Sequence, residues 1–238
     1  MSVESNTVLN FSAIGESLPL YFSGVLVTLK LLLMALVIGL AFAIPLGVLR
    51  ASRNKWLSSP VWCFTYFFCG TPMLVQLFLI YYGLAQFEWM RESFVWPWFS
   101  SAWFCAAFAF AVNTSAYTTE IIAGAIRGTN VGEIEAAKSM GMSRWVMVRR
   151  ILLPSALRRA LPAYSNEVIF MLHGTSLASI VTLMDLTGAA RQMNSTFYLP
   201  FEAFLTAGAF YLVLTFILVG LFHFAEKRFL VHLRPRTT

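Results

Sequence analysis

Charged side chains are scarce in this chain. They make up 12% of its 238 residues, about half the share found in an ordinary soluble domain, whereas 58% of the residues are apolar and Phe alone occurs 22 times. So few charges cannot cover the surface of a soluble particle of this size, and a soluble globular domain is excluded. Disorder is excluded too, because disordered chains are poor in aromatic and aliphatic residues. The composition therefore indicates a membrane protein.

The sequence also lacks the familiar catalytic and metal-binding patterns. None of its four lysines follows a glycine, so it contains no GxxxxGK[ST] phosphate loop and is not itself a P-loop ATPase. The single aspartate excludes sites built on two aspartates, and the three histidines form no HExxH pair. The three cysteines lie in apolar stretches without CxxC spacing, which favours small buried side chains over a metal site. We expect no catalytic residue, no metal and no cofactor bound by this chain.

What dominates the sequence is a set of long stretches without any charge. Five such stretches contain between 17 and 32 residues each. A helix needs about 20 residues to cross a hydrocarbon core of about 30 Å. If two stretches are extended past the single charges of Lys30 and Glu167, the sequence predicts an all-α membrane protein. Its five transmembrane helices are expected at about 21–49, 57–86, 96–119, 162–184 and 203–224.

The distribution of Lys and Arg predicts the orientation of these helices. The links on one side carry 14 basic residues, those on the other carry two, and residues 1–29 carry none. The positive-inside rule then makes residues 1–20 a periplasmic segment and 229–238 a cytoplasmic tail, on either side of a transmembrane domain at 21–228. The long link 127–160 is cytoplasmic. Since the basic charge belongs to these links, we expect no nucleic acid partner.

Three features inside the spans predict how the helices pack. Pro72 should free the carbonyl of Phe68 and kink the second helix. Glu120 is expected to pair with Arg127 or Arg158. Small residues recur every four positions along the third helix and favour close helix packing. These are Ala107, Ala111, Ser115, Thr119 and Ala123.

The link 127–160 has the pattern of two short helices separated by a break. Glycine at position 141 permits the left-handed conformation that ends a helix, and Ser143 can cap the next one. Pro154 is expected to end this second element. Two interpretations stay open at this point: a basic amphipathic segment on anionic lipid, or a cytoplasmic helix pair that docks into another protein. The apolar stripe of the second element comprises Trp145, Val148, Ile151 and Leu152.

A longer pattern in this link resembles the EAA motif of bacterial ABC-importer membrane subunits. It reads Glu135-Ala136-Ala137, then Gly141 after three residues, then Ile151-x-Leu153-Pro154 after nine more. The block Gly70-Thr71-Pro72 with Gln76 resembles the polar amino-acid uptake branch of that family, and the resemblance extends over about 28–228. The chain is similar to the M-type permease subunits of histidine, lysine, arginine and ornithine uptake systems. Many relatives carry Arg where this chain has Cys69.

The resemblance implies a type I ABC-importer transmembrane domain in the bacterial inner membrane. It implies a second, homologous membrane subunit in a heterodimer or a homodimer, two copies of a cytoplasmic ATPase that uses ATP, and a periplasmic solute-binding protein. The substrate would be a polar, basic amino acid: arginine, ornithine, lysine or histidine. The EAA residues would contact the ATPase and couple hydrolysis to transport: Glu135, Ala136, Ala137, Gly141, Ile151, Leu153 and Pro154.

Polar residues within the predicted spans are candidates for the substrate path, because their burial costs free energy unless they are paired or face water. If the fourth helix starts at Pro162, His173 lies about 16 Å along it and shares a face with Asn166. A half-polar helix of this kind lines a water-filled path, or else its polar groups form structural hydrogen bonds between helices; both interpretations stay open. The candidates are Thr71, Gln76, Asn166, Glu167, His173, Thr175 and Ser176.

Two functions from other classes compete with the importer subunit. A stand-alone carrier or channel subunit is disfavoured, since five helices are few for a carrier with inverted repeats and no such repeat is visible. A membrane-anchored enzyme would have to be built on His173 and Glu167 without any known nucleophile motif. The sequence therefore favours a translocation subunit.

Overall fold

The computed structural model describes residues 9–230, and this part of the chain contains helices and short turns but no strand. The all-α class is thus confirmed. Residues 1–8 of the expected periplasmic segment and 231–238 of the expected tail lie outside the described residues. The long helices are α1 (Phe11–Arg50), α2 (Lys55–Gly70), α6 (Ala102–Arg127), α9 (Leu153–Gly174) and α11 (Pro200–Phe229). The short helices are α3 (Met73–Phe78), α4 (Glu88–Arg91), α5 (Trp96–Phe99), α7 (Val131–Ser139), α8 (Arg144–Met147) and α10 (Leu186–Phe197).

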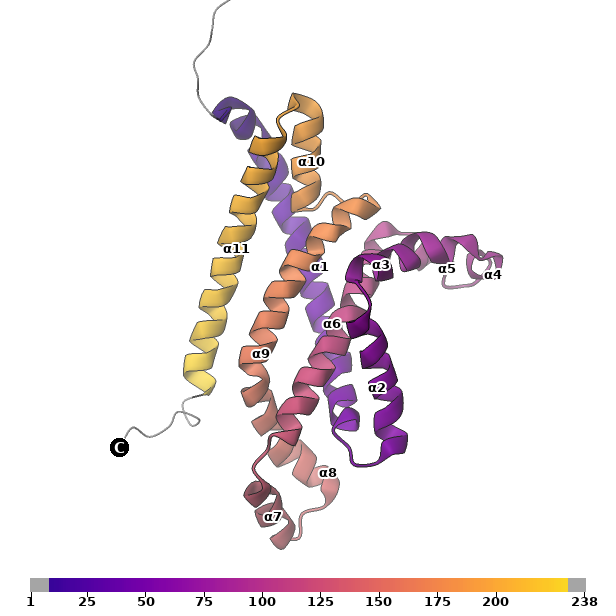
Figure 1. Ribbon diagram of the computed structural model, residues 1–238, viewed down its shortest axis with the longest axis vertical. Helices are drawn as coiled ribbons and strands as arrows, with labels where there is room; N and C mark the ends of the chain where they lie inside the picture. Colours follow the sequence, from indigo (N-terminus) through magenta and orange to yellow (C-terminus); the bar gives the residue numbers. More distant parts are fainter. Residues whose placement is uncertain (1–8, 231–238) are drawn as a thin grey trace, which may run out of the picture.

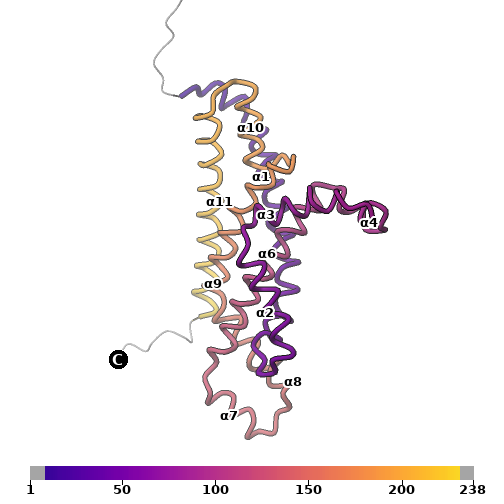
Figure 2. Tube along the Cα trace, turned by 45° about the vertical axis from the view of Figure 1, so that its right-hand side comes forward, coloured from indigo at the N-terminus to yellow at the C-terminus, as the bar shows by residue number. Residues whose placement is uncertain are grey.

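The long helices run side by side along the long axis of the molecule (Figure 1). Helices α7 and α8 project from one end, which we call the hairpin end, and α10 lies near the opposite end beside the start of α1. Helices α4 and α5 lie on a segment that leaves the bundle sideways, and it does so in the rotated view as well (Figure 2).

The α1–α6 pair is the centre of the bundle, and small residues make its close packing possible. A Cβ added at Gly47 of α1 would lie 2.7 Å from Cγ2 of Ile122 on α6, so only glycine fits there. The predicted small-residue stripe of α6 is buried along its whole length, as expected for close helix packing. Both helices run toward the hairpin end, so their C-terminal ends meet there.

The second predicted span is interrupted as the proline suggested, and more sharply than a kink. Helix α2 ends at Gly70 and α3 begins at Met73, and the chain bends by 101° between α2 and the helical segment Met73–Gln86. Beyond α3 the chain passes through a π-helical turn (Leu79–Gly83) and a 3-10 turn (Leu84–Gln86) into α4 and α5. The third predicted span, placed at 96–119, begins only at Ala102 and continues to Arg127.

Two predictions about prolines are wrong, one in the link 127–160 and one at the start of the fourth span. Pro154 does not end the element that starts at Arg144, and Pro162 lies inside α9 rather than at its start. The helix continues because a π-helical turn (Val148–Leu152) precedes Pro154, with Leu153 N donating to the Val148 carbonyl five residues back. This wider turn accommodates a ring that would clash with the preceding turn of a regular helix. Helix α9 passes into a 3-10 turn (Thr175–Val181).

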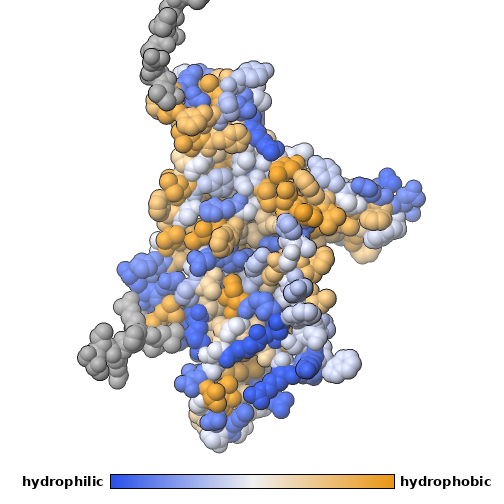
Figure 3. Space-filling model, in the orientation of Figure 1, coloured by the Kyte–Doolittle hydropathy of each residue, from blue (hydrophilic) through white to orange (hydrophobic). Residues whose placement is uncertain are grey.

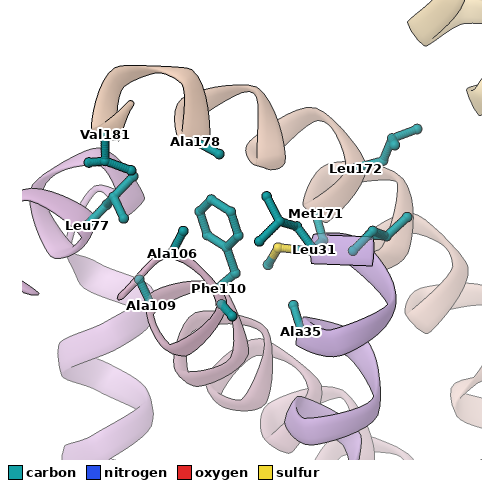
Figure 4. Packing of buried hydrophobic residues seen from close by; sticks show 12 residues of the cluster. Leu31, Ala35, Leu77, Ala106, Ala109, Phe110, Met171, Leu172, Ala178 and Val181 are labelled. Atoms are coloured by element: carbon teal, nitrogen blue, oxygen red, sulfur yellow. The ribbon is translucent and has the colours of Figure 1, made fainter. Parts of the chain in front are cut away.

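The main hydrophobic core lies where α1, α3, α6 and α9 meet. The ring of Phe110 is fully buried at its centre, with Leu31 of α1 and Met171 of α9 on one side of it (Figure 4). Leu77 of α3 and Val181 of the 3-10 turn close the cluster on the other side. The broken α2–α3 segment is therefore packed against the rest of the bundle through α3.

Apolar side chains also cover much of the outer surface (Figure 3). Among residues 9–230, α1 and α11 are able to cross a membrane by length and composition, and this part of the chain has up to four spans if each bent pair counts as one. The pairs are Lys55–Gly70 with Met73–Gln86, and Arg144–Val181 with Leu186–Phe197. Helix α6 has 26 residues but carries Asn113, Thr114 and Ser115 at its centre, all buried inside the bundle. A span buried among other helices needs less hydrophobicity than one that faces lipid.

Candidate functional site

The hairpin end is formed by α7 and α8, and Gly141 sets the turn between them. Its φ is +70°, the left-handed conformation that the sequence predicts. Gly141 N donates to the Lys138 carbonyl at 2.9 Å, and Met142 N donates to the Ala137 carbonyl at 3.2 Å. This pair of bonds is a Schellman motif, which satisfies the last carbonyls of α7. Ser143 then caps α8, accepting a hydrogen bond from Val146 N, as predicted.

A small apolar cluster holds the two helices together. Ala137 of α7 is fully buried against Met147 and Leu152. The predicted stripe contributes three residues to this cluster, but Trp145 is 70% exposed and points away from it. Sequence periodicity could not separate these roles, because the π turn that follows α8 rotates the later residues relative to Trp145.

The EAA residues are divided between the inside and the outside of this hairpin. Ala137 is buried, and Ile151 and Leu153 are partly buried, whereas Glu135, Ala136 and Pro154 are exposed. Within residues 9–230 the Glu135 carboxylate has no ion-pair partner. The exposed surface of the hairpin also carries Trp145, Val131 and Met140. Exposed apolar side chains gathered at one end of a molecule are typical of a surface that binds a second protein or lipid.

Arg159 of α9 ties the hairpin to the bundle. Its Nη2 donates to Thr129 Oγ1 at 2.6 Å and to the Ala125 carbonyl at 3.2 Å, and its Nη1 donates to Ser155 Oγ at 2.8 Å. The Arg159 guanidinium therefore joins the end of α6, the link that leads into α7, and the start of α9. Sequence reasoning missed this role. The helical spacing from buried Leu152 would have placed Arg159 on the inner face of α9.

A second polar cluster connects the ends of α1, α2 and α6. Glu120 forms an ion pair with Arg50, so its predicted pairing with Arg127 or Arg158 is wrong. Thr65 Oγ1 of α2 donates to the same carboxylate at 2.7 Å, and Arg127 donates to the Arg50 carbonyl at 2.9 Å. The reason is the parallel α1–α6 packing, which brings Arg50 beside α6 about two turns before the end of α6.

Within the bundle, Gln76 organises the break between α2 and α3. The Phe68 carbonyl, which Pro72 was predicted to free, accepts a hydrogen bond from Gln76 Nε2 at 2.8 Å. The same amide nitrogen donates to Thr71 Oγ1 at 2.7 Å, and Asn113 Nδ2 of α6 donates to Gln76 Oε1 at 3.1 Å. Asn113 was not among the predicted site residues, although an amide within an apolar run was a visible signal. Thr71 and Gln76 thus lie together and also line an apolar cavity of about 480 Å³.

The other candidate path residues lie on two sides of α9 and the turn after it. Asn166 and His173 are exposed, and a ring nitrogen of His173 lies 3.2 Å from Thr215 Oγ1 on α11. Glu167 and Thr175 are buried, and Thr175 donates to the Leu172 carbonyl at 2.6 Å. Ser176 is half-buried. Asn166 and His173 therefore share one open face of α9, while Glu167 and Thr175 point into the bundle.

Comparison with known proteins agrees with these features. The chain is 49% identical over 218 residues to the histidine/lysine/arginine/ornithine transport system permease protein HisM of Escherichia coli strain K12, covering 91% of this chain and 92% of that one. It is 44% identical over 229 residues to the nopaline transport system permease protein NocM of Agrobacterium fabrum strain C58, covering 96% and 95%.

A solved structure is similar over almost the whole fold. The crystal structure of an amino acid ABC transporter with histidines aligns with a TM-score of 0.82 at 33% identity, covering 92% of this chain and 99% of that chain. The fold is thus similar to that of type I ABC-importer permeases. Residues 43–231 match the model of the family described as binding-protein-dependent transport system inner membrane component. This chain belongs to that family of ABC-importer inner membrane subunits.

Proposed function

We propose that the chain is the translocation subunit of an ATP-driven importer for polar, basic amino acids in the bacterial inner membrane. The hairpin formed by α7 and α8 carries this proposal. It is a preformed element with its own apolar cluster, it is fixed to the bundle through Arg159, and it presents Glu135 and Trp145 outward. A contact of this kind can pass a displacement from an ATPase to the membrane helices.

The proposed assembly contains a second, homologous membrane subunit, most simply in a heterodimer, with a homodimer as the alternative. Two copies of a separate ATPase would bind at the hairpin end, and a periplasmic binding protein would dock at the opposite end. This chain contributes no ATPase site and binds no cofactor, in keeping with the lack of a phosphate loop in its sequence. The rival function as a stand-alone carrier or channel finds no support in the relatives.

The proposed topology has five spans. They are α1, the broken α2–α3 segment, α6, α9 with its 3-10 turn, and α11, with the N-terminus outside and the C-terminus in the cytoplasm. The 14-to-2 distribution of Lys and Arg supports this orientation. Reporter fusions placed after Phe229 should read as cytoplasmic, and a periplasmic signal there would contradict the topology.

Basic substrates are proposed because the name of the Escherichia coli relative lists histidine, lysine, arginine and ornithine. In addition, Asn166 and His173 offer polar groups on an open face of α9. The test is uptake of radiolabelled arginine into vesicles that contain the chain with its genomic partner subunits. ATP-dependent uptake requiring the ATPase and the binding protein is expected. Uptake by the chain alone, driven by an ion gradient, would establish the carrier function instead.

A further inference from the structure

The segment from Leu84 to Ser101, which includes α4 and α5, forms an arm that leaves the bundle sideways. It follows the π-helical turn after α3, begins with the 3-10 turn and ends at the start of α6, and it points away from the long helices in both views (Figures 1 and 2). None of the site residues described above belongs to it. Its role is therefore separate from coupling and from the substrate path.

The length of α6 indicates how deep the arm lies relative to the membrane. Ala102, the first residue of α6, follows the arm directly, and Glu120 forms the ion pair with Arg50 near the hairpin end. The 18 residues between these positions correspond to about 27 Å of helix. That distance matches a hydrocarbon core of about 30 Å. When the Glu120–Arg50 pair lies at one boundary of the core, the arm lies at the other.

The composition of the arm fits that boundary. Six of its 18 residues are aromatic, all of them Phe or Trp, which is a third of the segment compared with 16% aromatic residues (Phe, Trp and Tyr) in the whole chain. Phe94 is 85% exposed and Trp89 is 65% exposed. Figure 3 shows apolar surface along the edge of the arm that faces the hairpin end and polar surface at its tip. Trp gathers at membrane–water boundaries because its amphipathic ring lies at the headgroup level, and exposed Phe in an interfacial segment places its apolar ring on the acyl-chain side.

We propose that the arm is a lipid-binding element that lies in the headgroup region of the outer bilayer leaflet and inserts its aromatic rings among the acyl chains. The segment is too short to span the membrane. Its charges, Glu88, Arg91 and Glu92, nearly cancel, so the attraction comes from apolar insertion and does not require anionic lipid. A binding protein or another subunit covering the arm is the alternative that the experiment below excludes or establishes.

Spin labels at two exposed positions of the arm test the proposal directly. Phe94→Cys and Arg91→Cys are labelled in the complete transporter in vesicles, after Cys63, Cys69 and Cys105 have been replaced by serine and uptake has been verified. Arg53→Cys, exposed in the turn between α1 and α2, serves as the water reference, and spin-labelled lipids serve as the depth reference. The oxygen-to-nickel accessibility ratio should be several-fold higher at Phe94 than at Arg53, with Arg91 in between. The ratios should be equal in neutral and anionic vesicles.

Two results would overturn the proposal. A ratio at Phe94 equal to that at Arg53 would put the arm in water, and a label inaccessible to both reagents would put it under another protein. If the cysteine-free chain does not fold, Trp fluorescence of the chain with its native cysteines tests the same proposal. Lipids brominated near the headgroup should quench Trp emission, and the Trp89→Phe/Trp98→Phe variant should lose part of that quenching. Unchanged quenching in this variant would equally refute the insertion of the arm.

Discussion

The conformation of Gly141 gives the sharpest prediction about the hairpin. A Cβ built on Gly141 meets nothing within 4 Å, so a substitution causes no collision and its whole effect comes from the φ of +70°. Left-handed backbone costs a residue with a Cβ about 1–2 kcal/mol, Asn less than Ala, and β-branched Val most. A cost of this size lowers the population of the native turn by about 5- to 30-fold relative to alternatives. The three buried residues of the hairpin cluster and their partners oppose that change.

The assay is ATPase binding and substrate-stimulated ATP hydrolysis in reconstituted vesicles containing the Asn, Ala and Val variants of Gly141. Activity should fall in the order Gly, Asn, Ala, Val, with membrane insertion unchanged. Gly132→Ala is the matched control, because Gly132 lies within helix α7, where alanine is favourable, and its nearest neighbour is 3.5 Å from the added Cβ. Equal activity in all three variants, or a loss in Gly132→Ala as large as in Gly141→Ala, would refute the argument.

Three further predictions concern the residues that fix the hairpin and the bundle. Arg159→Met removes the hydrogen bonds that a charged donor makes to Thr129, Ala125 and Ser155, which should destabilise the hairpin by about 2 kcal/mol and uncouple ATP hydrolysis from uptake. Arg158→Met, at an exposed position of the same helix, is the control and should have neither effect. Equal ratios of transport to hydrolysis in the two variants would contradict the role of Arg159. Gln76→Leu leaves the Phe68 carbonyl and the Asn113 amide without this partner, which should lower the free energy of unfolding in detergent by about 1–2 kcal/mol. Gln86→Leu, at an exposed position, should change it little. Coincident thermal melting curves of the two variants would show that the break between α2 and α3 does not depend on the Gln76 amide. His173→Leu should impair uptake without loss of assembly, whereas Phe170→Leu on the same face of α9 should leave uptake unchanged. If Thr215→Val reproduces the uptake defect of His173→Leu, the contact of His173 with α11 is structural, and His173 does not line the substrate path.

Local rules predicted the turn and the helix break from sequence. Gly141 with Ser143 gave a left-handed stop and a cap, and both are present because they depend on a few adjacent residues. Pro72 lacks an N–H, so the loss of the bond to the Phe68 carbonyl followed from position alone. The small-residue stripe of α6 was predictable for the same reason, since its four-residue period is visible without any partner.

Contacts between helices far apart in sequence were beyond local rules. Glu120 pairs with Arg50 because glycine at position 47 sets how closely α1 and α6 approach, and nothing near Glu120 encodes that register. The prolines at 154 and 162 looked like helix boundaries, yet the π turn before Pro154 lets one helix continue from the hairpin into the bundle. The hydrogen bonds of Arg159 also depend on this continuous helix, because it places Arg159 beside the end of α6. The family resemblance, by contrast, rested on a spaced motif and is confirmed.

The central claim is that the hairpin couples ATP hydrolysis by another subunit to movement of substrate through this one. Glu133 and Glu135 are both exposed acidic residues of α7, two positions apart, and only Glu135 belongs to the EAA motif. The decisive measurement is the number of amino acid molecules imported per ATP hydrolysed in vesicles containing Glu135→Gln, with Glu133→Gln as the control. The account predicts a ratio that falls several-fold for Glu135→Gln, or an ATPase that no longer binds, and a normal ratio for Glu133→Gln. Normal binding and a normal ratio in Glu135→Gln would contradict it.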